Sequence, residues 1–207
     1  PMQSVSPSPT ADAHEPPITF LVPGFLDSLK TLESLAKYLR RRGHRPMICS
    51  PQPSDGSAPL EDLADQLAAF IDKAAPGDEP INLFGFSMGG LITRLYLQRF
   101  NQYHRVQRYV TVAAPHRGTQ TAHVFATLPG IQQMKPGSPL IRQLEEDLDK
   151  LKTIYFVSIW TPLDLTIIPA DSSELPVGIS RRILSPAHGL LMYDPRVQHA
   201  VSLALRR

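Results

Sequence analysis

The feature that most constrains this chain is a short apolar run, residues 81–84, that leads directly into Gly85-Phe86-Ser87-Met88-Gly89-Gly90 and then into a helical pattern. This order of strand, Gly-x-Ser-x-Gly and helix is typical of a turn so sharp that the residues two positions before and two after the serine must lack side chains. The turn leaves the serine hydroxyl standing at the start of a helix, so Ser87 is the candidate nucleophile. The alternative is a glycine-rich turn in which the serine is incidental.

The rest of the chain alternates short apolar runs with amphipathic stretches, which predicts an α/β fold. Continuous apolar strands separated by amphipathic helices indicate a mostly parallel sheet of about six strands with helices on both faces. The expected strands cover residues 18–22, 47–50, 81–84, 108–114, 153–160 and 181–184, and the expected helices include 28–42, 58–75 and about 195–205. Residues 17–207 are expected to form one domain, and residues 1–16, rich in Pro, Ser, Thr and Ala, a disordered tail.

Composition excludes several classes of protein. The 21 Lys and Arg are scattered among 19 Asp and Glu, and the net charge is only +2, so nothing points to nucleic acid. Cys49 is the one cysteine, which excludes an intrachain disulfide and a multi-thiolate metal site, and no metal or other cofactor is expected. No apolar run is long enough to cross a membrane and the start lacks the pattern of a secretion signal, so a cytoplasmic location is expected.

Two polar residues fall where partners of Ser87 are needed. A serine hydroxyl requires a base, and the base requires an acid on its far nitrogen; in a sheet of this kind the acid and then the histidine follow later strands. Asp164 comes just after the expected strand 153–160, and His188 just after 181–184. The alternatives are a turn or capping aspartate and a solvated loop histidine. Asp171 is the second candidate for the acid, although its Ala and Ser neighbours resemble a polar turn.

Acyl transfer also needs preorganised N–H donors for the developing oxyanion. Met88 N–H directly follows the nucleophile at a helix amino end, and it supplies the first candidate. Phe25 N–H, after Pro23-Gly24 in the loop that follows the first strand, supplies the second.

These residues resemble the α/β-hydrolase fold, and within it the small triacylglycerol lipases and esterases, a group described together with GPI-inositol-deacylase-like hydrolases. The resemblance runs from about Ile18 to the end of the chain. It rests on four ordered segments: Leu21-Val22-Pro23-Gly24-Phe25, the Gly85–Gly90 turn, Val110 to Thr119 with its Pro-His-x-Gly-Thr ending, and Met134 to Leu140. The chain departs from the pattern at Pro23, where most of these lipases carry histidine.

An insertion at about 119–151 is not needed by the strand pattern. Its second half, residues 139–151, places Leu140, Ile141, Leu144, Leu148 and Leu151 on one helical face. A cap or lid over Ser87 and an ordinary packing helix are both open at this point. The candidate substrate-binding residues are Leu26, His116, Phe125, Leu128 and Met134, with a hydrogen-bonded turn as the alternative role of His116. Arg94 and Arg99 are expected on the solvated face of the helix after Ser87.

The sequence therefore predicts a serine hydrolase that cleaves carboxylic esters, with apolar acyl groups, through an acyl-enzyme on Ser87. An acyltransferase or thioesterase would use the same residues, and a non-catalytic binding module on the same fold is the alternative from another class. The expected partners are small-molecule esters or lipids, with transient contact with lipid surfaces.

Overall fold

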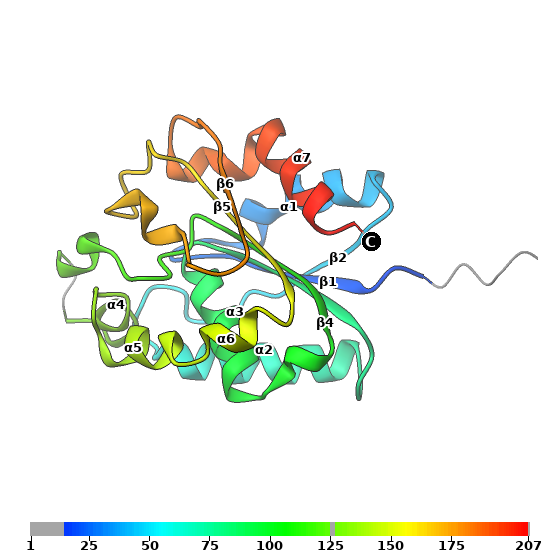
Figure 1. The fold of residues 1–207 in the computed structure, drawn as a ribbon, viewed down its shortest axis with the longest axis horizontal. Helices are drawn as coiled ribbons and strands as arrows, with labels where there is room; N and C mark the ends of the chain where they lie inside the picture. Colours follow the sequence, from blue (N-terminus) through cyan, green and yellow to red (C-terminus); the bar gives the residue numbers. More distant parts are fainter. Residues whose placement is uncertain (1–14, 125–126, 207) are drawn as a thin grey trace, which may run out of the picture.

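The computed structural model describes residues 15–124 and 127–206, which build a six-stranded parallel sheet between two layers of helices (Figure 1). The strand order is β2-β1-β3-β4-β5-β6. The strands are β1 (Ile18–Val22), β2 (Arg45–Ile48), β3 (Ile81–Phe86), β4 (Val106–Val112), β5 (Tyr155–Trp160) and β6 (Ile179–Arg182). The predicted mostly parallel sheet of about six strands with helices on both faces is confirmed.

Helices cover the two faces of the sheet unequally. α1 (Leu29–Arg41) and α7 (Pro195–Ala204) lie on one face, and α2 (Leu60–Ala74) and α3 (Met88–Arg99) on the other (Figure 1). The second face also carries the short helices of the insertion, α4 (Pro129–Gln133), α5 (Pro139–Glu145) and α6 (Leu148–Leu151). Short 3₁₀ helices lie in the connections: η1 (Gln102–His104), η2 (Gln120–His123), η3 (Ala170–Ser173) and η4 (His188–Tyr193).

The core forms because successive side chains of a strand point to opposite faces. One row across the sheet joins the α2–α3 core and consists of Phe20, Leu83, Tyr109 and Phe156. The next row joins the α1–α7 core and consists of Leu21, Phe84, Val110 and Val157. Both faces are therefore buried along the central strands, which explains why their sequences read as continuous apolar runs.

Most strand boundaries differ from the sequence expectation by about two residues, and three differences have a clear physical reason. β4 ends at Val112 because Ala113 adopts φ +48, which no strand residue does. β6 lies two residues earlier than expected; all four of its residues are exposed, and its position is set by pairing with β5. The expected helix 139–151 is divided into α5 and α6 because Asp147, at φ −101 and ψ 12, interrupts it and accepts a hydrogen bond from Tyr103.

The strand order places a crevice at one edge of the sheet. The chain passes from β1 outward to β2 and then back to β3 on the other side of β1. The loops that leave the carboxyl ends of β1 and β3 therefore diverge, which is where parallel α/β sheets form their binding sites. Within the described ranges, no helix has the length and apolar character needed to cross a membrane.

Candidate active site

Ser87 occupies the turn between β3 and α3 in a strained conformation. Its backbone has φ 54 and ψ −125, a region that favours glycine. A Cβ added to Gly85 would lie 2.6 Å from Gly89 O, and one added to Gly89 would overlap Val22 O. The predicted need for residues without side chains on both sides of the serine is confirmed.

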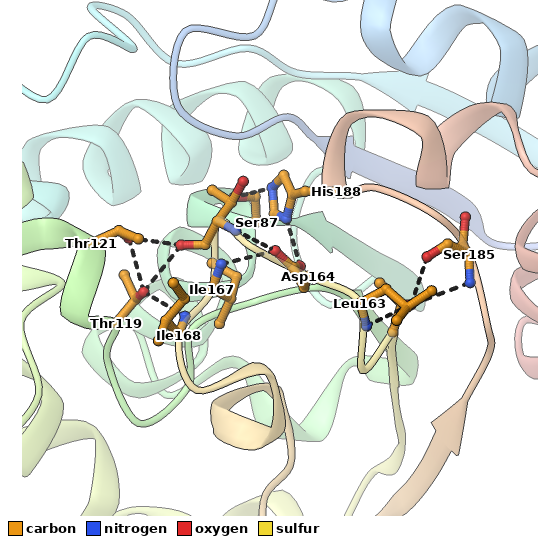
Figure 2. A network of polar contacts seen from close by, with 11 residues as sticks. Ser87, Thr119, Thr121, Leu163, Asp164, Ile167, Ile168, Ser185 and His188 are labelled. Atoms are coloured by element: carbon orange, nitrogen blue, oxygen red, sulfur yellow. Dashed lines mark hydrogen bonds and ion pairs between the residues drawn. The ribbon is translucent and has the colours of Figure 1, made fainter.

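The side chains of Ser87, His188 and Asp164 form one hydrogen-bonded chain (Figure 2). His188 Nε2 lies 3.0 Å from Ser87 Oγ, and His188 Nδ1 lies 2.7 Å from Asp164 Oδ2. The three residues follow β3, β6 and β5, so the common carboxyl edge of the sheet brings together positions far apart in the chain. The Phe86 ring packs against the imidazole with centroids 5.0 Å apart, which helps to fix the plane of the histidine.

The Asp164 carboxylate is held at both oxygens. Oδ1 accepts hydrogen bonds from Thr166 N–H at 2.8 Å and Ile167 N–H at 2.9 Å, which leaves Oδ2 for His188. The other candidate acid, Asp171, lies on η3 with its side chain 55% exposed and 3.5 Å from the Arg117 guanidinium. Of the two candidates, the structure brings Asp164 into hydrogen-bond distance of His188.

The loop after β1 presents Phe25 beside Ser87. Gly24 N–H donates to Asp27 Oδ2 at 3.1 Å, and Asp27 N–H donates back to Gly24 O at 3.2 Å. Burial raises the pKa of the Asp27 carboxyl above its ordinary value, and the bond from Gly24 N–H opposes that rise. Sequence reasoning missed Asp27 as the residue that shapes this loop. Thr31 Oγ1 donates to the same carboxylate at 3.1 Å, and the only trace of this contact in the sequence is the four-residue spacing of Asp27 and Thr31.

An apolar cavity of about 130 Å³ opens next to Ser87. Met134, a predicted substrate-binding residue, lines it, whereas Leu128 packs against the core and Leu26 is 67% exposed. Phe125 lies outside the described residues. The full lining consists of Phe25, Ser87, Pro115, Thr119, Thr121, Ala122, Ile131, Met134, Thr166 and Ile167.

His116 is buried in the core and does not line the cavity beside Ser87, unlike the position expected of a substrate-binding residue. Its side chain is fully buried, with Nε2 2.9 Å from Thr111 Oγ1 and the ring edge against Phe156. Burial, with a smaller effect of Arg94, lowers the pKa of His116 well below its ordinary value. The imidazole is therefore a neutral part of the core, which agrees with the alternative of a structural role.

Arg94 is also corrected, because it is buried rather than solvated. Its guanidinium donates to His116 O at 3.3 Å and to Leu144 O at 2.6 Å. Burial lowers the pKa of Arg94. The reason is that residues 88–97 of α3 are all buried, packed against the sheet, α2 and α5. Arg99, at the end of the helix, is exposed as expected and pairs with Asp65.

Comparison with known families identifies the relatives of this chain. The sequence model of the family described as "Palmitoyl protein thioesterase" matches residues 19–148, which is more than half of the chain. The chain belongs to the palmitoyl protein thioesterase family. The matched part of this thioesterase-family protein includes the loop after β1, the Ser87 turn and most of the insertion. A search of curated proteins with the chain's sequence found no match.

Solved structures share its fold. Bacillus licheniformis lipase BlEst2 in mature form superposes with a TM-score of 0.76 at 16% identity, over 97% of this chain and 95% of that one. Aspergillus fumigatus lipase B gives 0.80 at 16% identity, over 93% of this chain but only 53% of the fungal chain. Paleococcus ferrophilus monoacylglycerol lipase gives 0.67 at 15% identity, over 92% and 95%. The predicted α/β-hydrolase fold is confirmed, and with the family it makes the protein an ester-cleaving serine hydrolase, with thioesters equally compatible.

The α5 segment of the insertion is anchored to the body of the protein. Leu140, Ile141 and Leu144 are buried, and Arg94 and Gln98 of α3 donate to Leu144 O and Gln143 O. These contacts favour the packing alternative over a mobile lid for α5.

We expect Leu144→Ser to lower the free energy of unfolding by about 2 kcal/mol or more, because it creates a cavity and buries a hydroxyl. Turnover of short-chain and long-chain esters should fall alike as the folded fraction falls. Urea denaturation and matched ester assays measure both, with Glu145→Ser on the exposed side of the same helix as control. Selective loss of long-chain turnover at unchanged stability would instead support a lid.

Proposed function

We propose that the protein hydrolyses esters and thioesters of short and medium acyl chains through a Ser87–His188–Asp164 triad. The observation that carries this proposal is the unbroken hydrogen-bonded chain from Asp164 through His188 to Ser87 at the mouth of an apolar cavity. Such an arrangement converts a weak nucleophile into an effective one, since the imidazole accepts the serine proton.

In the acylation step, Ser87 Oγ attacks the carbonyl carbon while its proton passes to His188 Nε2. The bond to the leaving group then breaks, and His188 returns the proton to the departing alkoxide or thiolate. Asp164 holds Nδ1–H and stabilises the imidazolium. Met88 N–H, at the first position of α3 where no intrahelical acceptor exists, and Phe25 N–H are the proposed oxyanion donors. Water activated by His188 then cleaves the acyl-enzyme and restores Ser87.

The acyl preference follows from the cavity. Sites that enclose a drug-sized ligand measure roughly 300–1,000 Å³, whereas this cavity has about 130 Å³ and is lined by Ile131 and Met134 among others. A short or medium acyl chain fills that space, and a palmitoyl chain exceeds it.

Exposed leucines near the proposed site suit transient contact with a lipid surface. Leu26, Leu165 and Leu190 follow β1, β5 and β6, and each is more than half exposed. Because the carboxyl ends of parallel strands share one edge of the sheet, these side chains stand on the same side of the molecule as Ser87.

The test is a series of p-nitrophenyl esters and matched thioesters from acetyl to palmitoyl, together with labelling by a fluorophosphonate probe. We expect probe labelling, and a kcat/KM that peaks between butyryl and octanoyl and is at least about tenfold lower for palmitoyl. Folded protein that neither labels nor turns over any member of the series would refute the enzyme and leave a binding module. A palmitoyl optimum would refute only the acyl preference.

A further inference from the structure

Thr119 ends the Pro-His-x-Gly-Thr segment, and its hydroxyl is built into the loop that carries Asp164 (Figure 2). The residue is 4% exposed. Its Oγ1 accepts a hydrogen bond from Ile168 N–H at 2.9 Å and lies 3.1 Å from Thr166 O. Thr121 Oγ1, 2.9 Å from Thr119 Oγ1, donates to the same Thr166 carbonyl at 2.7 Å.

Backbone hydrogen bonds also fix the position of Thr119. Its N–H donates to Met134 O at 2.8 Å, and Gln120 N–H donates to Ile168 O at 2.8 Å. The segment 119–121 therefore runs beside residues 166–168 and hydrogen-bonds to three of their backbone groups. These groups are the carbonyl of Thr166 and both the N–H and the carbonyl of Ile168.

Residues 166–168, held by these hydrogen bonds, also orient the carboxylate of Asp164, the proposed acid. Thr166 N–H and Ile167 N–H both donate to Asp164 Oδ1, and this leaves Oδ2 turned toward His188 at 2.7 Å. A shift of residues 166–168 would therefore move the carboxylate away from the imidazole.

We infer that Thr119 is a positioning residue for the triad, acting through the Asp164 loop. The inference rests on the proposed function, because it assigns Thr119 a role only if Asp164 orients the imidazole of His188. Thr119 also lines the acyl cavity, so a role in acyl binding is the competing explanation. The two explanations differ in what depends on the hydroxyl: triad geometry needs it, whereas the shape of the cavity needs only the volume of the side chain.

The test replaces Thr119 by Val, which keeps the volume and removes the hydroxyl, and by Ser, which keeps the hydroxyl. We expect Thr119→Val to lower kcat on the order of tenfold to a hundredfold, equally for short and medium acyl chains and with KM little changed, because a misplaced catalytic group costs about that much. The pH at which the rate falls to half on the acid side should move downward, since a displaced carboxylate stabilises the imidazolium less.

Thr119→Ser should restore most of kcat. Thr121→Val, which removes a bond to Thr166 O but none to Ile168, is the matched control and should cost less.

A double-mutant cycle with Asp164→Asn separates this inference from the proposed function. If Thr119 acts through Asp164, adding Thr119→Val to Asp164→Asn should lower kcat by less than about threefold more. Additive losses, an unchanged acid limb in Thr119→Val, or failure of Ser to rescue would overturn the inference while leaving the triad intact. A negligible effect of Asp164→Asn alone would instead overturn the proposed acid. If Thr119→Val does not fold, Thr119→Ala, which also removes the hydroxyl, takes its place in the cycle with Asp164→Asn, and Thr119→Ser remains the rescue.

Discussion

Ser87→Ala should lower kcat/KM for esters and thioesters by on the order of a thousandfold or more. It should also eliminate labelling by the fluorophosphonate probe. The reason is that the alanine lacks the Oγ that His188 Nε2 contacts at 3.0 Å, so no acyl-enzyme forms. The measurement is kcat/KM on the ester that wild-type protein prefers, with probe labelling followed by gel.

The variant should remain folded, because alanine keeps the Cβ that already fits the φ 54 turn. Its thermal unfolding midpoint should therefore stay close to that of the wild type. Ser28→Ala is the control, since Ser28 is exposed and its side chain forms no cap hydrogen bond to α1. Retention of more than about a tenth of wild-type turnover in folded Ser87→Ala would exclude Ser87 as the nucleophile.

The second large effect is expected for Asp164→Asn, which should lower kcat by about a thousandfold or more. The two backbone N–H groups of Thr166 and Ile167 hold the oxygen at the Oδ1 position, so the asparagine carbonyl will take that place and its NH₂ will face His188. An NH₂ donor forces Nδ1 to act as acceptor and puts the ring proton on Nε2. An imidazole in that tautomer cannot accept the proton of Ser87.

Asp171→Asn is the matched control for the acid. Its carboxylate is more than half exposed and pairs only loosely with Arg117, so we expect a loss of less than about tenfold. Single-turnover assays of both variants beside the wild type make the comparison. The reverse ranking would transfer the acid role to Asp171.

The candidate site was largely predictable because each of its parts is signalled locally. The Ser87 turn needs glycines at 85 and 89, and a chain that lacked them could not close the turn. Asp164 was proposed from its place after the apolar run that forms β5, because a buried parallel strand must be apolar along its whole length. Phe25 was found in the same way, after β1. His188 was proposed from the order of an acid followed by a histidine on the next loop, since the strand before it is exposed.

Other features had no local signal. β6 is exposed along its length, so nothing in its own residues distinguishes Ile179–Arg182 from the neighbouring positions, and only pairing with β5 sets its bounds. The cavity beside Ser87 depends on Ile131, Met134 and Ile167, which come together from separate segments.

The sequence by itself predicted the fold class, the turn at Ser87 and the places of Asp164 and His188 after later strands, because apolar runs, glycines and polar loop residues are recognised from near neighbours in the chain. The tertiary structure decided what surrounds them. Arg94 lies on a helix that reads as amphipathic, yet its guanidinium binds carbonyls 22 and 50 residues away, and Thr119 holds Ile168 across 49 positions. Whether a polar side chain meets solvent or a distant backbone group depends on which elements pack over it, and that packing is a property of the whole chain.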